Sequence, residues 1–81
     1  MNRQILLKEA LKYNGKVTKS EYNSYDQSYT LEIEAPDGKQ WADGNCNCIV
    51  VIWWRYVKGS MAEEFTYAIE RMSYGLENID L

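Results

Sequence analysis

The stretch NCNCIVVIWWRYVKGS, residues 45–60, contains the longest apolar segment of the chain, residues 49–57. Isoleucine, valine, tryptophan and tyrosine dominate it, and these β-branched and aromatic residues favour strands. No polar face recurs at helical spacing, so the stretch predicts the longest strand of the domain, over residues 47–57. A buried helix is the competing interpretation. A membrane span is not expected, because nine residues interrupted by Arg55 fall short of the roughly 20 apolar residues that cross a bilayer.

Both faces of this strand would be largely apolar, because alternate side chains of a strand point to opposite faces of its sheet. One face would carry Ile49, Val51, Trp53, Arg55 and Val57, and the other Cys48, Val50, Ile52, Trp54 and Tyr56. If two helices cover the same face, the other face stays exposed and marks an interaction site. If one helix covers each face, both are buried. Pairing of residues 49–57 with a second copy, giving a homodimer, is a further alternative.

Helices are predicted at both ends of the chain. Asn2 can cap a helix over residues 2–14, which carries a broad apolar stripe formed by Ile5, Leu6, Leu7, Ala10 and Leu11. Ser60 and Glu63 have the spacing of a capping box, which predicts a second helix over residues 61–74 that ends at Gly75. Residues 76–81 form a short acidic tail that we expect to fray.

Extended segments fill the middle of the chain. Strands are predicted over residues 16–24 and 28–35, where β-branched residues, tyrosines and alternating polarity prevail. Pro36-Asp37-Gly38 is a typical turn sequence and predicts a hairpin that returns through a strand over residues 39–42. The order of elements predicts one α+β domain over residues 1–81, a small two-layer domain in which two helices pack on a three- to four-stranded antiparallel meander.

Charge is distributed unevenly along the 81 residues. The net charge is −3, but residues 1–20 carry a net +4 and the rest of the chain a net −7. Such an asymmetry points to electrostatic steering of partners. The first 13 residues mix charges with apolar residues and do not resemble a secretory signal peptide, so a cytoplasmic protein is expected.

The residue types argue against an enzyme. The chain has no histidine, which excludes histidine general bases, the familiar triads and histidine-ligated metals. Its five glycines are dispersed and form no phosphate-binding loop. Glu32 and Glu34 are expected on a solvated strand face, and Glu63 and Glu64 in the first turn of a helix, so neither pair predicts catalysis. No cofactor is expected.

The two cysteines, Cys46 and Cys48, supply half of a tetrahedral zinc site at most. Two chains could complete such a site across a dimer, which is the weaker alternative. A disulfide between residues two apart would be strained, so reduced thiols that pack as small apolar groups are the favoured interpretation.

The segment EYNSYDQSY, residues 21–29, has the composition of a binding loop, since tyrosine gives large contact area and small polar residues adapt their hydrogen bonds. A polar hairpin that covers the sheet edge is the simpler explanation. The candidate partner-binding residues combine this segment with acidic residues and with the tryptophan pair: Tyr22, Tyr25, Asp26, Tyr29, Glu32, Glu34, Asp37, Trp53 and Trp54.

Two electrostatic hypotheses concern nucleic acid. The basic N-terminal segment could bind phosphates through Lys8, Lys12, Lys16 and Lys19, although the acidic body of the chain opposes this. Conversely, the carboxylates of residues 21–43 could mimic phosphates and occupy the nucleic-acid site of a partner.

No motif identifies a family. In size, charge and expected architecture the chain is similar to small inhibitors and regulators carried by phages and mobile elements, such as anti-CRISPR proteins. The resemblance implies a non-enzymatic interaction protein that occludes the surface of a larger protein, which could be a nucleic-acid-processing complex. A nucleic-acid-binding accessory protein and a structural homodimer are the alternatives.

Overall fold

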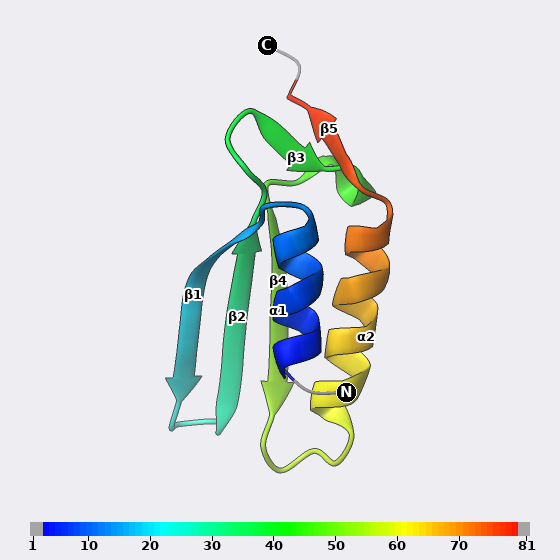
Figure 1. Ribbon diagram of the computed structural model, residues 1–81. Helices are drawn as coiled ribbons and strands as arrows, with labels where there is room; N and C mark the ends of the chain where they lie inside the picture. The colour runs from blue at the N-terminus through cyan, green and yellow to red at the C-terminus, as the bar shows by residue number, and fades with distance from the viewer. Residues whose placement is uncertain (1–2, 80–81) are drawn as a thin grey trace.

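The computed structural model describes residues 3–79 and has eight elements (Figure 1). In chain order they are α1 (Arg3–Lys12), β1 (Lys16–Asn23), β2 (Ser28–Glu34), β3 (Lys39–Trp41), the short 3-10 helix η1 (Asp43–Asn45), β4 (Cys48–Trp54), α2 (Ser60–Ser73) and β5 (Leu76–Asn78). The predicted segments agree with these bounds, except that β4 ends three residues early and the tail contains a strand. The predicted cap Asn2 lies outside the described residues.

The α+β prediction is confirmed. The main sheet is antiparallel with strand order β1-β2-β4, and β3 pairs with β5 in a separate two-stranded sheet. The predicted hairpin between residues 28–35 and 39–42 is therefore wrong. The seven-residue strand β4 pairs with β2 along its whole length, from Ser28↔Trp54 to Glu34↔Cys48. The three-residue strand β3 pairs instead with the tail, from Lys39↔Asn78 to Trp41↔Leu76, and residues 76–78 are ordered rather than frayed.

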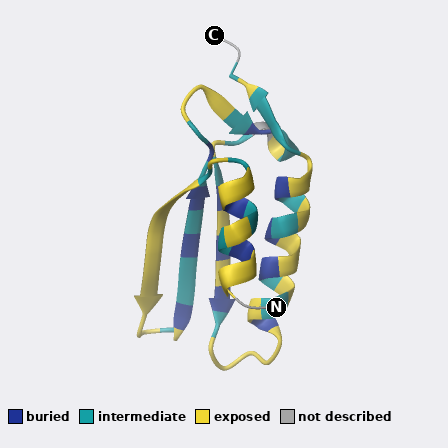
Figure 2. Cartoon of the chain, viewed as in Figure 1, coloured by how far each residue is buried: buried dark blue, intermediate teal, exposed yellow. Residues whose placement is uncertain are grey.

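Both helices cover the same face of the main sheet (Figure 1). On this covered face of β4, Ile49, Val51 and Trp53 are buried, whereas Val50 and Ile52 on the open face are exposed (Figure 2). Of the two arrangements that the sequence left open, the chain adopts the one with an open sheet face.

The core contains fewer residues of α1 than the sequence predicts. Leu6 and Ala10 are fully buried, but Ile5 is 46% and Leu11 70% exposed. The sheet has only three strands and α2 packs closely on β4, so only one narrow stripe of α1 reaches the core. The other members of the core come from the strands, from Ala35 just after β2, and from α2: Leu31, Ile33, Ala35, Trp41, Ile49, Val51, Trp53, Phe65, Ala68 and Met72.

The predicted capping box is wrong. Gly59, with a φ of 84°, is the N-cap of α2, and Ser60 is already the first helical residue. The Ser60 Oγ accepts the backbone N–H of Trp54 at 3.2 Å. The Glu63 N–H donates to the Gly59 carbonyl at 3.0 Å. Ser60 thus ties the end of β4 to the start of α2 and is not available to cap the helix.

Candidate partner-binding site

One end of the molecule gathers two loops and the starts of both helices, at the bottom of Figure 1. We call it the hairpin end and define it by the β1–β2 turn (residues 24–27), the β4–α2 loop (residues 55–59) and the first turns of α1 and α2. The Arg55 N–H donates to the Gln27 carbonyl at 3.0 Å and so joins the two loops.

The β1–β2 turn is fixed by side chains on either side of its tip. The Asn23 Oδ1 accepts the N–H of Tyr25 at 2.9 Å, and the Asp26 Oδ1 accepts the N–H of Ser28 at 3.1 Å. A hydrogen bond from a backbone N–H to the side chain of an Asn or Asp two residues earlier stabilises a single loop conformation. Gln27 adopts a positive φ of 54° to close the turn. Tyr25, at the tip, is 96% exposed.

Four aromatic rings form a row across the covered face of the sheet at this end. The ring centroids of Tyr22 and Tyr29 lie 4.7 Å apart, those of Tyr29 and Trp53 lie 5.4 Å apart and stack, and Phe65 meets the Trp53 ring edge-on at 4.8 Å. The strand register produces this row, since Tyr29 lies opposite Tyr22 on one side and Trp53 on the other. Exposure rises along the row, from 8% at Trp53 to 45% at Tyr22.

A cavity of about 630 Å³ opens next to this row, between the start of α1, the end of β4 and the start of α2. Its walls contain aromatic and aliphatic side chains together with three cations. The lining residues are Arg3, Tyr29, Trp53, Trp54, Arg55, Val57, Lys58, Gly59, Met61 and Ala62.

The three cations Arg3, Arg55 and Lys58 were missed by the sequence reasoning. Arg55 and Lys58 follow the apolar strand in the segment WWRYVK, and this alternation of cations with aromatic residues is the signal that could have found them. Arg3 comes from a segment far away in sequence, so only the fold brings it to the cavity. Its Nη2 donates to the Ser20 Oγ at 2.7 Å.

The predicted partner-binding residues fall into two groups. Tyr22, Tyr25, Asp26, Tyr29, Trp53 and Trp54 come together at the hairpin end. Glu32 and Glu34 lie toward the other end of β2, and Asp37 lies in the β2–β3 turn. The structure therefore separates the predicted aromatic residues from these predicted acidic residues.

Cations and hydrogen-bond donors accompany the acidic group. Lys19 lies opposite Glu32 and Lys16 opposite Glu34 in the sheet register. The Thr18 Oγ1 donates to the Glu32 Oε1 at 3.0 Å, and the Lys16 Nζ lies 3.3 Å from the Asp37 Oδ1. This surface is a mixture of charges, which weakens its likeness to a row of phosphates.

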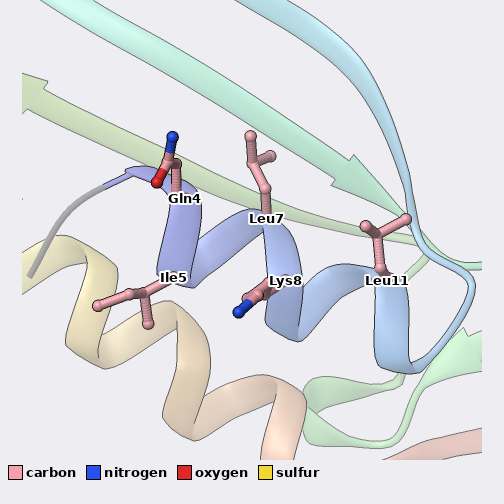
Figure 3. A pocket seen from close by; sticks show the side chains of 5 residues that line it. All are labelled: Gln4, Ile5, Leu7, Lys8 and Leu11. Atoms are coloured by element: carbon pink, nitrogen blue, oxygen red, sulfur yellow. The ribbon is translucent and has the colours of Figure 1, made fainter.

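Three of the four lysines proposed to bind nucleic acid also form ion pairs with acidic residues. Lys12 pairs with Glu9 at 3.2 Å, Lys16 with Asp37, and Lys19 with Glu21 at 3.7 Å. Lys8 lines a hollow of about 370 Å³ on α1 together with Gln4, Ile5, Leu7 and Leu11 (Figure 3). This hollow is mainly aliphatic and is formed by one helix, so it is a weak candidate for phosphate contacts.

The two thiols have different surroundings. The Cys46 Sγ lies 3.6 Å from the Asp43 carbonyl oxygen and 3.4 Å from the Arg71 Nη2, whereas the Cys48 Sγ lies 3.6 Å from the Glu32 Oε1. Burial, together with the neighbouring Glu32 carboxylate, raises the pKa of the Cys48 thiol. Within residues 3–79, no three or more histidine, cysteine, aspartate and glutamate side chains are grouped to hold a metal ion.

Comparisons of the chain with protein-family models, curated proteins and solved structures find no match. Among the described residues, no helix is long and apolar enough to cross a membrane.

Proposed function

We propose that this protein is a non-enzymatic interaction module, a small inhibitor or regulator that occludes the surface of a larger protein with its hairpin end. One observation carries the proposal: exposed apolar side chains gather at this end, two of them in the lining of the cavity and three in β1 and the two neighbouring loops. They are Tyr22, Tyr25, Tyr56, Val57 and Met61, with exposed fractions between 38% and 96%. Exposed apolar residues that gather in this way usually mark an interaction site.

The construction of the hairpin end supports tight contact. The hydrogen bonds of Asn23 and Asp26 hold the turn before any partner arrives, so little conformational entropy is lost on binding. Tyrosine at the tip adds contact area with few rotatable bonds, and tyrosine is enriched among the residues that dominate binding energies. The size and net charge fit the phage and mobile-element inhibitors to which the sequence is similar.

Contact through the acidic residues has less support. Lys16 and Lys19 lie beside Glu32 and Glu34 on the sheet, and a partner that binds nucleic acid would meet these cations as well. The hairpin end, where apolar side chains and three cations line one cavity, does not depend on phosphate mimicry and is the better candidate.

Site-specific photo-cross-linking tests the proposal. A benzophenone amino acid replaces Tyr25 in one variant and Tyr74 in the control, which is also exposed, at 63%, but lies at the opposite end of α2. In extracts of the native host, the Tyr25 variant should give a discrete cross-linked species that excess unlabelled wild-type protein suppresses. Cross-linking from Tyr74 alone, or equal cross-linking from both positions, would contradict the proposal.

A further inference from the structure

We infer that the cavity at the hairpin end binds an acidic segment of the partner protein. The carboxylates of that segment contact the cations that line the cavity, and one of its apolar side chains contacts the apolar lining residues. The inference rests on the proposed function, because it names the chemistry of the partner at that same end.

Charge complementarity is the first argument. Arg3, Arg55 and Lys58 all line the cavity, and the described lining residues include no aspartate or glutamate. The ion pairs found among residues 3–79 involve other cations, namely Lys12, Lys16, Lys19 and Arg71. Three cations that face one cavity, in a chain of net charge −3, form a local positive region that attracts carboxylates.

The lining of the cavity also supplies apolar contact. Tyr29, Trp53, Val57 and Met61 contribute aromatic and aliphatic surface. A volume of about 630 Å³ lies within the usual range of ligand sites, which is roughly 300 to 1,000 Å³, and suits a short peptide segment. Cations beside apolar surface select a segment in which acidic and apolar residues are neighbours.

The start of α2 adds to the positive potential. Met61 and Ala62, in its first turn, line the cavity, and no side chain caps this helix because its N-cap residue is Gly59. The N-terminal end of a helix carries a partial positive charge that favours anions. Glu63, in the same first turn, offsets part of this charge, so the helix end only assists the three cations and does not by itself define the site.

Single-stranded nucleic acid, also anionic, fits the cavity less well. Nucleotide binding of that kind needs aromatic faces on which bases stack. Trp53 is 8% exposed, stacks on Tyr29 at an interplanar angle of 11° and meets Phe65 edge-on. Its ring has little surface left for a base, which leaves stacking to Tyr29 and Trp54, both only partly exposed, whereas a peptide needs only apolar contact beside the cations.

Fluorescence anisotropy with defined probes tests the inference. The probe is a labelled 12-residue peptide of alternating glutamate and leucine, and its matched control has glutamine at every glutamate. A third probe is a labelled oligothymidylate of 12 nucleotides. The site variant carries Arg55→Gln and Lys58→Gln, and the matched variant carries Lys8→Gln and Lys12→Gln, which change the net charge equally on the outer side of α1.

The acidic peptide should bind the wild-type protein, and the site variant should bind it at least about tenfold more weakly. The matched variant should stay within about twofold of wild type, because its lysines lie outside the cavity. The glutamine peptide should bind far more weakly than the acidic one. Circular dichroism of both variants should match that of the wild-type protein.

Several results would overturn the inference. If both charge variants bind the acidic peptide equally weakly, net charge alone determines the affinity. If the glutamine peptide binds as tightly as the acidic one, carboxylates are not recognised. Tighter binding of oligothymidylate, lost in the site variant, would assign the cavity to nucleic acid. If no peptide binds but Tyr25 still cross-links a partner, the inference fails and the proposed function stands; loss of that cross-link is what would remove the proposed function itself.

Discussion

The tryptophans at the two ends of the molecule have different surroundings. At the end formed by β3, β5 and η1, which we call the closed end, Trp41 is fully buried, its Nε1–H donates to the Ile33 carbonyl at 3.2 Å and Tyr13 packs against its ring edge-on. At the hairpin end, Trp53 and Trp54 line a cavity between three cations. Trp41 lies wholly within the core, Trp53 belongs to the core and also borders the cavity, and the half-buried Trp54 borders the cavity alone.

The charged groups follow the same division. At the closed end the Arg71 Nε lies 2.7 Å from the Asp43 Oδ2, in a pair whose side chains are only 22% and 34% exposed. At the hairpin end, Arg3, Arg55 and Lys58 line a cavity with no described acidic neighbour in its wall. Polar groups that satisfy one another stabilise the fold, whereas a group of like charges favours an external partner.

The largest effect on stability should come from a substitution in the core at the closed end. Trp41→Ala removes the largest fully buried side chain and should lower the free energy of unfolding by about 3 to 5 kcal/mol. Urea denaturation followed by circular dichroism measures this loss. Trp54→Ala, at a half-buried position, should cost clearly less; an equal cost would remove the distinction between the two ends.

Removing the tip of the hairpin end should impair binding and spare stability. Tyr25→Ala should weaken partner binding by about 2 kcal/mol, since an anchor tyrosine is lost. The free energy of unfolding should change by less than about 0.5 kcal/mol, because the side chain is 96% exposed. Calorimetric titration and urea denaturation of the same variant measure both quantities. Unchanged affinity would show that the tip is not part of the interface.

The charge pair at the closed end should have a smaller effect on stability. Arg71→Gln removes the contact with Asp43 and the packing of the guanidinium over the Tyr67 ring, and should lower the free energy of unfolding by about 1 to 2 kcal/mol. Lys19→Gln breaks a more exposed pair with Glu21 and is the matched control, with little change expected. Thermal unfolding at low and high salt compares the two variants, and equal losses would contradict a structural role for Arg71.

The smallest effect concerns Cys48 on the open sheet face. Burial and the Glu32 carboxylate raise its pKa, so the thiol stays protonated to higher pH and reacts slowly with iodoacetamide at pH 8. Glu32→Gln removes the negative neighbour, lowers this pKa and should increase the alkylation rate by about threefold. Mass spectrometry of the Cys48 peptide over a pH series provides the measurement, with the Cys46 peptide as internal reference. A slower reaction would contradict the assigned cause.

Local sequence patterns predicted most of the elements but not all of their partners. The β-branched and aromatic residues of β4 and the periodicity of α2 were sufficient to place both. The pairing of β3 with β5 could not be predicted, because two three-residue segments separated by more than thirty residues carry no local pairing signal. The sequence also did not indicate that Asn14, two residues after the end of α1, takes the left-handed conformation with a φ of 59°.

Gly15 lies where the chain packs too closely for a side chain. A Cβ at this position would lie 3.1 Å from the Ile33 Cγ2 and 3.2 Å from the Ala10 carbonyl oxygen, so glycine allows close packing of the chain. Such a contact is a property of the assembled core. Part of the candidate site could likewise be predicted from the sequence, namely the tyrosines and tryptophans of the hairpin end. The convergence of Arg3 with Arg55 and Lys58 depends on tertiary structure and could not.

Hydrogen–deuterium exchange on the free protein and on its co-purified complex would locate the binding surface. New protection is expected in residues 24–27 and 55–62 at the hairpin end, with exchange at the closed end, in residues 39–41 and 76–78, unchanged. Protection confined to the closed end or to the open sheet face would contradict the assignment of the hairpin end as the binding surface.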